Sequence, residues 1–325
     1  MPKLSFPLDA LVRSRPRPPA DSPLERMTGL SPNPGALDGW ALVPPGARAL
    51  AVVLHGCRQD ARGFARGTGW EALARQQGFA LLLPDQNGPN NPWRCFNWFD
   101  PARAAAEAAS ILAMVRQLQA AHGLRQVFVA GLSAGGAMAA RLLATAPGVF
   151  AGGAVVAGLP FGAASDAEQA LAAMRDGAPE PAGGWAAPVR AAAAHEGPWP
   201  RVQVWQGLAD GVVNPANAQA LLAQWLGLHG ITWAPRGAVR VDGAHRLTWH
   251  DEAGRPAVES WTLEGLDHGV PIGAGGVPGP FLLDCGCHST WHIAAGWGLA
   301  GASRAAPEPL RHSPGWDCLH PAAGS

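Results

Sequence analysis

Residues 126–144, QVFVAGLSAGGAMAARLLA, contain the pattern that decides the fold of this chain. The apolar run at 126–130 predicts a strand that is buried on both faces, and residues 133–146 predict a helix. Between them, residues 131–135 form a G-x-S-x-G motif. Such a motif between a strand and a helix is typical of a nucleophile elbow, so Ser133 is the candidate nucleophile.

The glycines of this motif have a physical purpose. The turn is tight and strained, so a side chain at position 131 or 135 is expected to clash with neighbouring backbone. Ser133 then lies at the start of a helix, where partial positive charge favours a developing anion. The alternative interpretation is an N-cap serine that follows a glycine-rich turn.

Strands of the buried type alternate with helices on both sides of this motif. Further strands are predicted at 49–54, 79–83, 151–159 and 201–205, helices at 70–77, 102–121, 216–225 and 290–296, and short strands at 238–241, 246–250 and 258–263. This order predicts an α/β protein with a mostly parallel central sheet and helices on both faces. Together with the elbow, it predicts an α/β-hydrolase fold.

One catalytic domain is expected over residues 37–300. The proline- and glycine-rich stretch 161–198 interrupts the alternation, apart from a short helical piece at 166–174, and predicts a lid-like insertion. Residues 1–36 predict an extended or poorly ordered arm, and 301–325 a C-terminal tail.

Composition narrows the functional classes. The chain has 325 residues, of which 48% are hydrophobic, and a formal net charge of zero. These values predict a globular protein without a nucleic-acid partner. No apolar stretch reaches the length of a membrane span, and Met1–Ala10 shows no signal-peptide core, so a cytoplasmic location stays open. No cofactor is expected, and the oligomeric state is not indicated.

A nucleophilic serine requires a base, and His268 is the candidate. It lies in GLDHG at 265–269, directly after the strand predicted at 258–263, where this architecture assembles its site. The remaining candidates are expected on surface hairpins, on the insertion or near helix ends: His195, His229, His245, His250, His288 and His292.

The orienting acid is expected between the serine and the histidine in chain order. Asp210 fits, because it lies in GLADG at 207–211, after the strand predicted at 201–205. Its role is to hold one imidazole tautomer and to stabilise the imidazolium. Asp267 and Asp242 are alternatives, the first adjacent to the histidine and the second in a hairpin turn.

Two backbone amides are expected to form an oxyanion hole. One is Ala134, the residue after the nucleophile. The other is Cys57, in the loop LHGCRQ at 54–59, where Gly56 allows a close backbone approach. The alternative is that His55 and Gly56 merely end a strand.

Aromatic residues cluster in one loop after the second strand. Trp93, Phe96 and Trp98 are expected to contact an apolar substrate at the cleft. Core packing is the alternative interpretation of the same residues.

Four motifs occur in an order that resembles the esterase family of polyhydroxybutyrate (PHB) depolymerases. They are LHGC at 54–57, GTGW at 67–70, RCFNWF at 94–99 and GLSAGGAM at 131–138. The resemblance runs from about Trp40 to the HIA and WGL stretches at 292–299. It implies ester hydrolysis by a Ser-Asp-His triad, with Ser133, Asp210 and His268 in matching positions.

The resemblance also implies a disulfide between Cys57 and Cys95 beside the site. Such a bridge favours an extracellular or periplasmic location. One departure is Gln206, which stands where relatives often have histidine. Another is Cys285-x-Cys287-His288, followed by His292, whose spacing is unlike common zinc motifs, so no metal is predicted. Buried thiols, or a bridge that involves Cys318, are the expected roles of these cysteines.

The sequence therefore predicts a serine carboxylic ester hydrolase, with short-chain hydroxyalkanoate esters as the first substrate class. The first alternative is a feruloyl or acetyl esterase on plant polysaccharide esters. A peptidase would use the same catalytic groups. An alternative of another class is a non-catalytic binding protein on the same fold.

Overall fold

The computed structural model describes residues 23–231, 234–301 and 308–309. Its described part is built on an eleven-stranded sheet with the order β1-β2-β4-β3-β5-β6-β7-β10-β9-β8-β13. The strands are β1 (Glu25–Arg26), β2 (Asp38–Leu42), β3 (Ala49–Leu54), β4 (Ala80–Asp85), β5 (Gln126–Leu132), β6 (Gly152–Val156), β7 (Arg201–Gly207), β8 (Gly237–Val241), β9 (Ala244–His250), β10 (Pro256–Leu263) and β13 (Glu308–Pro309). Strands β4, β3, β5, β6, β7 and β10 are parallel, and antiparallel strands flank them.

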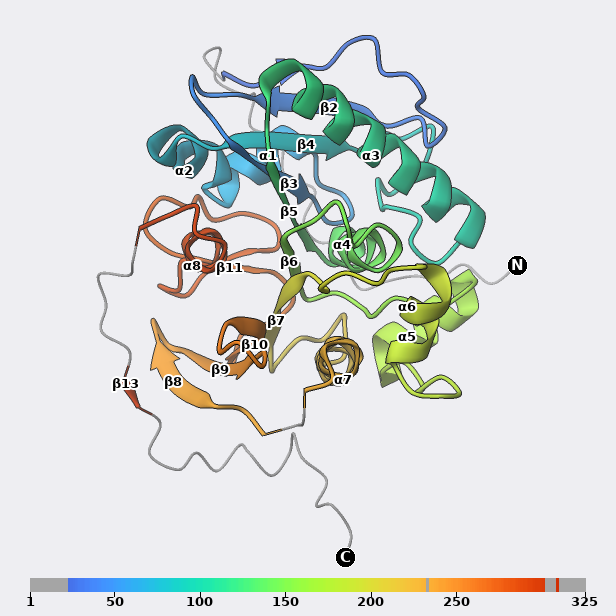
Figure 1. The fold of residues 1–325 in the computed structure, drawn as a ribbon, viewed down its shortest axis with the longest axis vertical. Helices are drawn as coiled ribbons and strands as arrows, with labels where there is room; N and C mark the ends of the chain where they lie inside the picture. Colours follow the sequence, from blue (N-terminus) through green and yellow to red (C-terminus); the bar gives the residue numbers. More distant parts are fainter. Residues whose placement is uncertain (1–22, 232–233, 302–307, 310–325) are drawn as a thin grey trace, which may run out of the picture.

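Helices cover both faces of the sheet, as predicted. On one face lie α3 (Pro101–His122), α4 (Ala134–Thr145), α6 (Ala186–Ala192) and α7 (Ala216–His229), and on the other α1 (Ala61–Gly67), α2 (Trp70–Gln77) and α8 (Ser289–Gly296) (Figure 1). Strand β3 is buried along its whole length, with Leu50 and Val52 in one core and Ala51 and Val53 in the other. This period of two explains why its sequence is apolar throughout.

Local signals account for the helix boundaries. The Asp100 side chain caps α3 by accepting from the Ala102 and Arg103 amides, and Gly123 ends this helix in the left-handed conformation (φ +66°). The strand expected at 79–83 extends to Asp85 instead of stopping at Pro84. Beyond Leu82 only β2 pairs with β4, which leaves room for a residue without an N–H.

Short elements departed from the sequence prediction. Residues 23–36 were expected in an arm, but Glu25–Arg26 pairs with β2 and Leu24 is buried. Glu308–Pro309 pairs with β8, although we expected it in a tail. Helices α1 and α6 and the two-stranded sheet of β11 (Val270–Ile272) and β12 (Leu282–Asp284) were not predicted either. Elements this short show too few periods to stand out from loops.

The insertion at 161–198 holds α5 (Ala167–Asp176) and α6. It lies beside α4 and α7 (Figure 1). Within it, Ala163 and Ala173 join a small apolar cluster with Trp98, Ala137 and Val213. Among the described residues, no helix is both long and apolar enough to cross a membrane.

Candidate active site

Ser133 stands at the turn from β5 into α4. Its backbone has φ +56° and ψ −118°, a conformation that non-glycine residues rarely adopt, and its amide donates to the Val156 carbonyl at 2.9 Å. Its side chain makes no capping hydrogen bond to the helix. An N-cap serine has extended backbone and accepts from the helix amides, so the capping interpretation does not account for this residue.

The expected steric need for glycine at positions 131 and 135 is confirmed. A Cβ on Gly131 would lie 2.2 Å from the Gly135 carbonyl oxygen. A Cβ on Gly135 would lie 2.5 Å from the His55 carbonyl oxygen and 2.6 Å from that of Leu54. The loop that follows β3 is therefore packed directly against the elbow.

We predict that Gly135→Ala destabilises the fold and impairs the site together. The new methyl group meets backbone rather than a flexible side chain, so we expect a loss of about 1–3 kcal/mol in the free energy of unfolding. Urea unfolding measures this loss. Gly148→Ala is the matched control, because a Cβ there meets nothing within 4 Å. Equal unfolding midpoints for the two variants would contradict the packing described above.

The structure brings Asp210 and His268 together from the loops after β7 and β10. Both are buried, and His268 Nδ1 lies 2.8 Å from Asp210 Oδ2. The same oxygen accepts from Gln206 Nε2 at 3.0 Å, and Oδ1 accepts from the Val212 and Val213 amides at 2.9 and 2.8 Å. With Asp210 as the acceptor, the imidazole proton lies on Nδ1 and the Nε2 lone pair can act as a base.

Gln206 and Asp267 are supporting residues whose roles were not predicted from the sequence. The Asp267 Oδ1 accepts from the Gly211 amide at 3.0 Å and the His268 amide at 2.7 Å, so it ties the two loops together. These backbone hydrogen bonds, the one from Gly211 foremost, lower the pKa of Asp267. The position of Asp267 beside His268 could have indicated a supporting role, but its backbone partners cannot be inferred from sequence.

Asp242 and four of the other candidate histidines lie in contacts of their own. Asp242 Oδ2 is 2.7 Å from His292 Nε2. His195 packs on Trp199, His229 contacts the Pro200 carbonyl and His245 lies 3.9 Å from Glu264.

Cys285 is exposed and Cys287 is buried, both as free thiols, and burial raises the pKa of Cys287. Cys318 lies outside the described residues. No group of three or more potential metal ligands is found in the described ranges.

The two expected oxyanion donors lie on segments that are packed together. The Cys57 and Ala134 amides donate no hydrogen bond to another group in the part of the chain that the structure describes. Cys57 is joined to Cys95 by a disulfide, and the adjacent Arg58 amide donates to the Trp93 carbonyl at 2.7 Å. The loop at 54–59 is thereby fastened to the aromatic loop.

The three aromatic candidates have different surroundings. Trp93 is 57% exposed and lies under the Arg58 guanidinium at 4.3 Å, and Trp98 is half-buried beside Ala137. Phe96 is a correction: it is fully buried and packs on the His55 ring at 5.1 Å, so it has no surface to offer a substrate.

A buried carboxylate explains why the chain turns inward at Phe96. Glu107 on α3 accepts from the Asn97 amide at 2.8 Å, from the Asn97 side chain, and from Gln86 Nε2 at 2.7 Å and Asn90 Nδ2 at 3.2 Å. Burial raises the pKa of Glu107 despite these donors. The burial of Glu107 could have been predicted from the sequence, because residue 107 shares a helix face with Ile111 and Val115.

Comparison with known proteins gives a consistent result. A sequence model of the family described as esterase PHB depolymerase matches residues 39–248. Poly(3-hydroxyalkanoate) depolymerase C of Paucimonas lemoignei is 34% identical over 293 residues, which cover 86% of this chain and 70% of that protein. Feruloyl esterase B of Talaromyces stipitatus is 28% identical, covering 76% and 72% of the two chains.

The fold also has a solved counterpart. The acetyl xylan esterase from Aspergillus awamori superposes with a TM-score of 0.68 over 77% of this chain and 95% of its own. At 24% sequence identity, this likeness shows that the two chains share a fold.

Proposed function

Because the chain belongs to the PHB depolymerase family of esterases and is a serine esterase, we propose that it cleaves short-chain poly(3-hydroxyalkanoate) or hydroxybutyrate esters through Ser133, Asp210 and His268. One observation carries the proposal. His268 and Asp210 form a buried hydrogen bond of 2.8 Å, and their loops follow strands of the same sheet that carries Ser133 at the turn after β5. A nucleophile, a base and its orienting acid are the groups that acyl transfer requires.

In the proposed mechanism, the Ser133 hydroxyl attacks the ester carbonyl while its proton passes to His268 Nε2. The Cys57 and Ala134 amides donate hydrogen bonds to the oxyanion of the tetrahedral intermediate. Its collapse returns the proton to the leaving alcohol and leaves an acyl-enzyme. Water, activated by His268, then releases the hydroxy acid and restores the serine.

Two observations support the rest of the proposal. The P. lemoignei relative favours a hydroxyalkanoate ester, whereas feruloyl and acetylxylan esterases among the relatives keep those esters as the second candidates. The Cys57–Cys95 disulfide supports an extracellular or periplasmic location, because such bridges persist in oxidising compartments.

Hydrolysis of three substrates tests the substrate class: p-nitrophenyl butyrate, 3-hydroxybutyrate oligomers and methyl ferulate. We expect the wild-type protein to cleave the butyrate ester and the oligomers, and Ser133→Ala to cleave none. Activity on ferulate but not on the oligomers would move the substrate to aromatic esters. Ester cleavage by the Ser133→Ala variant would contradict the nucleophile itself.

We further predict that Trp93 binds the part of an oligomer beyond the scissile ester. Trp93→Ala removes an exposed indole beside the loop that carries Cys57. We expect KM for the oligomers to rise by roughly 5- to 10-fold, as the loss of one aromatic contact implies, and kinetics on p-nitrophenyl acetate to stay unchanged. Val149→Ala, another exposed apolar side chain but on the loop between α4 and β6, is the control. Equal effects on both substrates would contradict this role.

A further inference from the structure

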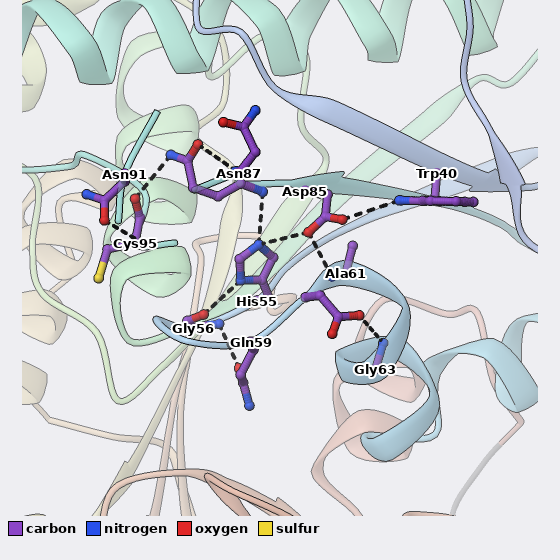
Figure 2. Close-up of polar contacts among 12 residues, drawn as sticks. Trp40, His55, Gly56, Gln59, Ala61, Gly63, Asp85, Asn87, Asn91 and Cys95 are labelled. Atoms are coloured by element: carbon purple, nitrogen blue, oxygen red, sulfur yellow. Dashed lines mark hydrogen bonds and ion pairs between the residues drawn. The ribbon is translucent and has the colours of Figure 1, made fainter. Parts of the chain in front are cut away.

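His55 is a fully buried histidine that the mechanism above does not use. It follows β3 directly, and its ring lies between Gly56 and Asp85 (Figure 2). Nδ1 is 2.7 Å from the Gly56 carbonyl oxygen, and Nε2 is 3.1 Å from the Gln86 amide nitrogen. Both contacts are to backbone groups.

These contacts fix the tautomer of the ring. The Gln86 amide can only donate, so Nε2 carries a lone pair, and the Gly56 carbonyl can only accept, so Nδ1 carries the proton. Burial lowers the pKa of His55, which keeps the ring neutral although Asp85 Oδ1 lies 3.5 Å from Nε2. The Asp85 carboxylate has other donors, the Ala61 amide at 3.1 Å and the Trp40 indole N–H at 3.3 Å.

The held carbonyl belongs to the peptide unit that supplies an expected oxyanion donor. The Gly56–Cys57 peptide is trans, because the one cis peptide bond of the described residues is Ser31–Pro32. In a planar trans peptide the C=O and N–H point in opposite directions. A Gly56 carbonyl directed at the His55 ring therefore turns the Cys57 N–H away from that ring.

The loop that contains this peptide packs against the elbow. A Cβ on Gly56 would lie 3.2 Å from the Leu132 side chain, and one on Gly135 would lie 2.5 Å from the His55 carbonyl oxygen. The loop is fixed at two more points, where the Gly56 amide donates to Gln59 Oε1 at 2.8 Å and where Cys57 is bonded to Cys95. Two further contacts act on the carbonyl and so on the peptide orientation: the His55 Nδ1 contact at 2.7 Å, which is the shorter, and the Gln59 amide, which donates to the same oxygen at 3.4 Å.

We propose that His55 is a positioning residue of the oxyanion hole: its Nδ1–H holds the Gly56 carbonyl and thereby aims the Cys57 N–H at the oxyanion. The inference rests on the proposed function, in which Cys57 supplies a donor. An apolar side chain could not donate to the carbonyl, and an imidazolium could not also accept from the Gln86 amide, so the neutral imidazole suits both contacts. Asp85 and Gln86, at the end of β4, hold the opposite edge of the same ring.

Two substitutions separate this role from packing. His55→Asn places an amide N–H near the Nδ1 position and keeps a donor to Gly56, whereas His55→Gln reaches the Nε2 position and loses that donor. We expect His55→Gln to lower kcat on p-nitrophenyl butyrate by about 10- to 100-fold with KM unchanged, because a misplaced Cys57 N–H stabilises the oxyanion less well. His55→Asn should recover most of the loss, although both variants bury an amide.

A trifluoromethyl ketone supplies a readout that a structural role does not move. Its adduct with the serine carries an oxyanion, so its inhibition constant should rise in His55→Gln by the same factor as kcat falls, and return in His55→Asn. The proposal would be overturned if kcat fell equally in both variants, if only KM changed, or if His55→Gln kept the wild-type kcat. If Ser133→Ala retained activity, the proposed function would fail instead.

A measurement on the wild-type protein applies even if a variant does not fold. In nitrogen-15 spectra of histidine-labelled protein, His55 is assigned through its contact with the Phe96 ring, 5.1 Å away. We expect a neutral ring with the proton on Nδ1. A neutral ring with its proton on Nε2 would contradict the proposal.

Discussion

Replacement of Ser133 by alanine will lower kcat on p-nitrophenyl butyrate by about 10⁴- to 10⁶-fold, the range seen when the nucleophile of a serine hydrolase is removed. The hydroxyl is the only group lost. Because the Ser133 side chain makes no capping hydrogen bond, its removal should leave the free energy of unfolding within about 0.5 kcal/mol of the wild-type value. The variant therefore separates catalysis from folding.

The measurement pairs initial rates with urea unfolding of the same preparations. Ser165→Ala is the matched control, since it removes another hydroxyl, from an exposed site where Ser165 contacts Gln169. The control should keep wild-type rates. A loss of less than tenfold for Ser133→Ala, with unfolding unchanged, would contradict the assignment of the nucleophile.

Replacement of Asp210 by asparagine will lower kcat by about 10⁴-fold through the imidazole tautomer. The Val212 and Val213 amides both donate to Asp210 Oδ1, so the single oxygen of asparagine will be drawn to that position. Its NH₂ group then faces His268 Nδ1, which must accept, and the proton moves to Nε2. A histidine in that tautomer cannot take the serine proton.

Asp267→Asn is the matched control for this substitution. Asparagine keeps an oxygen for the Gly211 and His268 amides, so we expect a loss of no more than about tenfold. Rates and unfolding midpoints of the two variants should be measured side by side. If Asp267→Asn were the more damaging, Asp267 rather than Asp210 would be the orienting acid.

The alternation of elements was predictable because it depends on local patterns. The strand at 49–54 and the helix at 70–77 have the predicted bounds, because an apolar run and a glycine that ends a helix are both patterns of consecutive residues. The glycine requirement at the elbow was predictable for the same reason. The family resemblance extended this to residues far apart in the chain, such as the bonded pair Cys57 and Cys95.

The polar groups that support the site were not predictable, because their partners are distant in sequence or are backbone atoms. His55 contacts Gly56 and the remote Gln86 amide. Phe96 was expected at the cleft, but the contacts of Asn97 with Glu107 turn the loop and bury the ring. Composition alone could not distinguish that ring from the exposed Trp93, since both lie in one aromatic loop.

The most direct test of the central claim is to locate the covalent adduct of a fluorophosphonate. Trypsin cleavage after Arg125 and Arg141 releases residues 126–141, QVFVAGLSAGGAMAAR, in which Ser133 is the only hydroxyl side chain. We predict one phosphonyl adduct per chain, on this peptide and at Ser133. An unlabelled 126–141 peptide, or an adduct on another peptide, would contradict the account of Ser133 as the nucleophile.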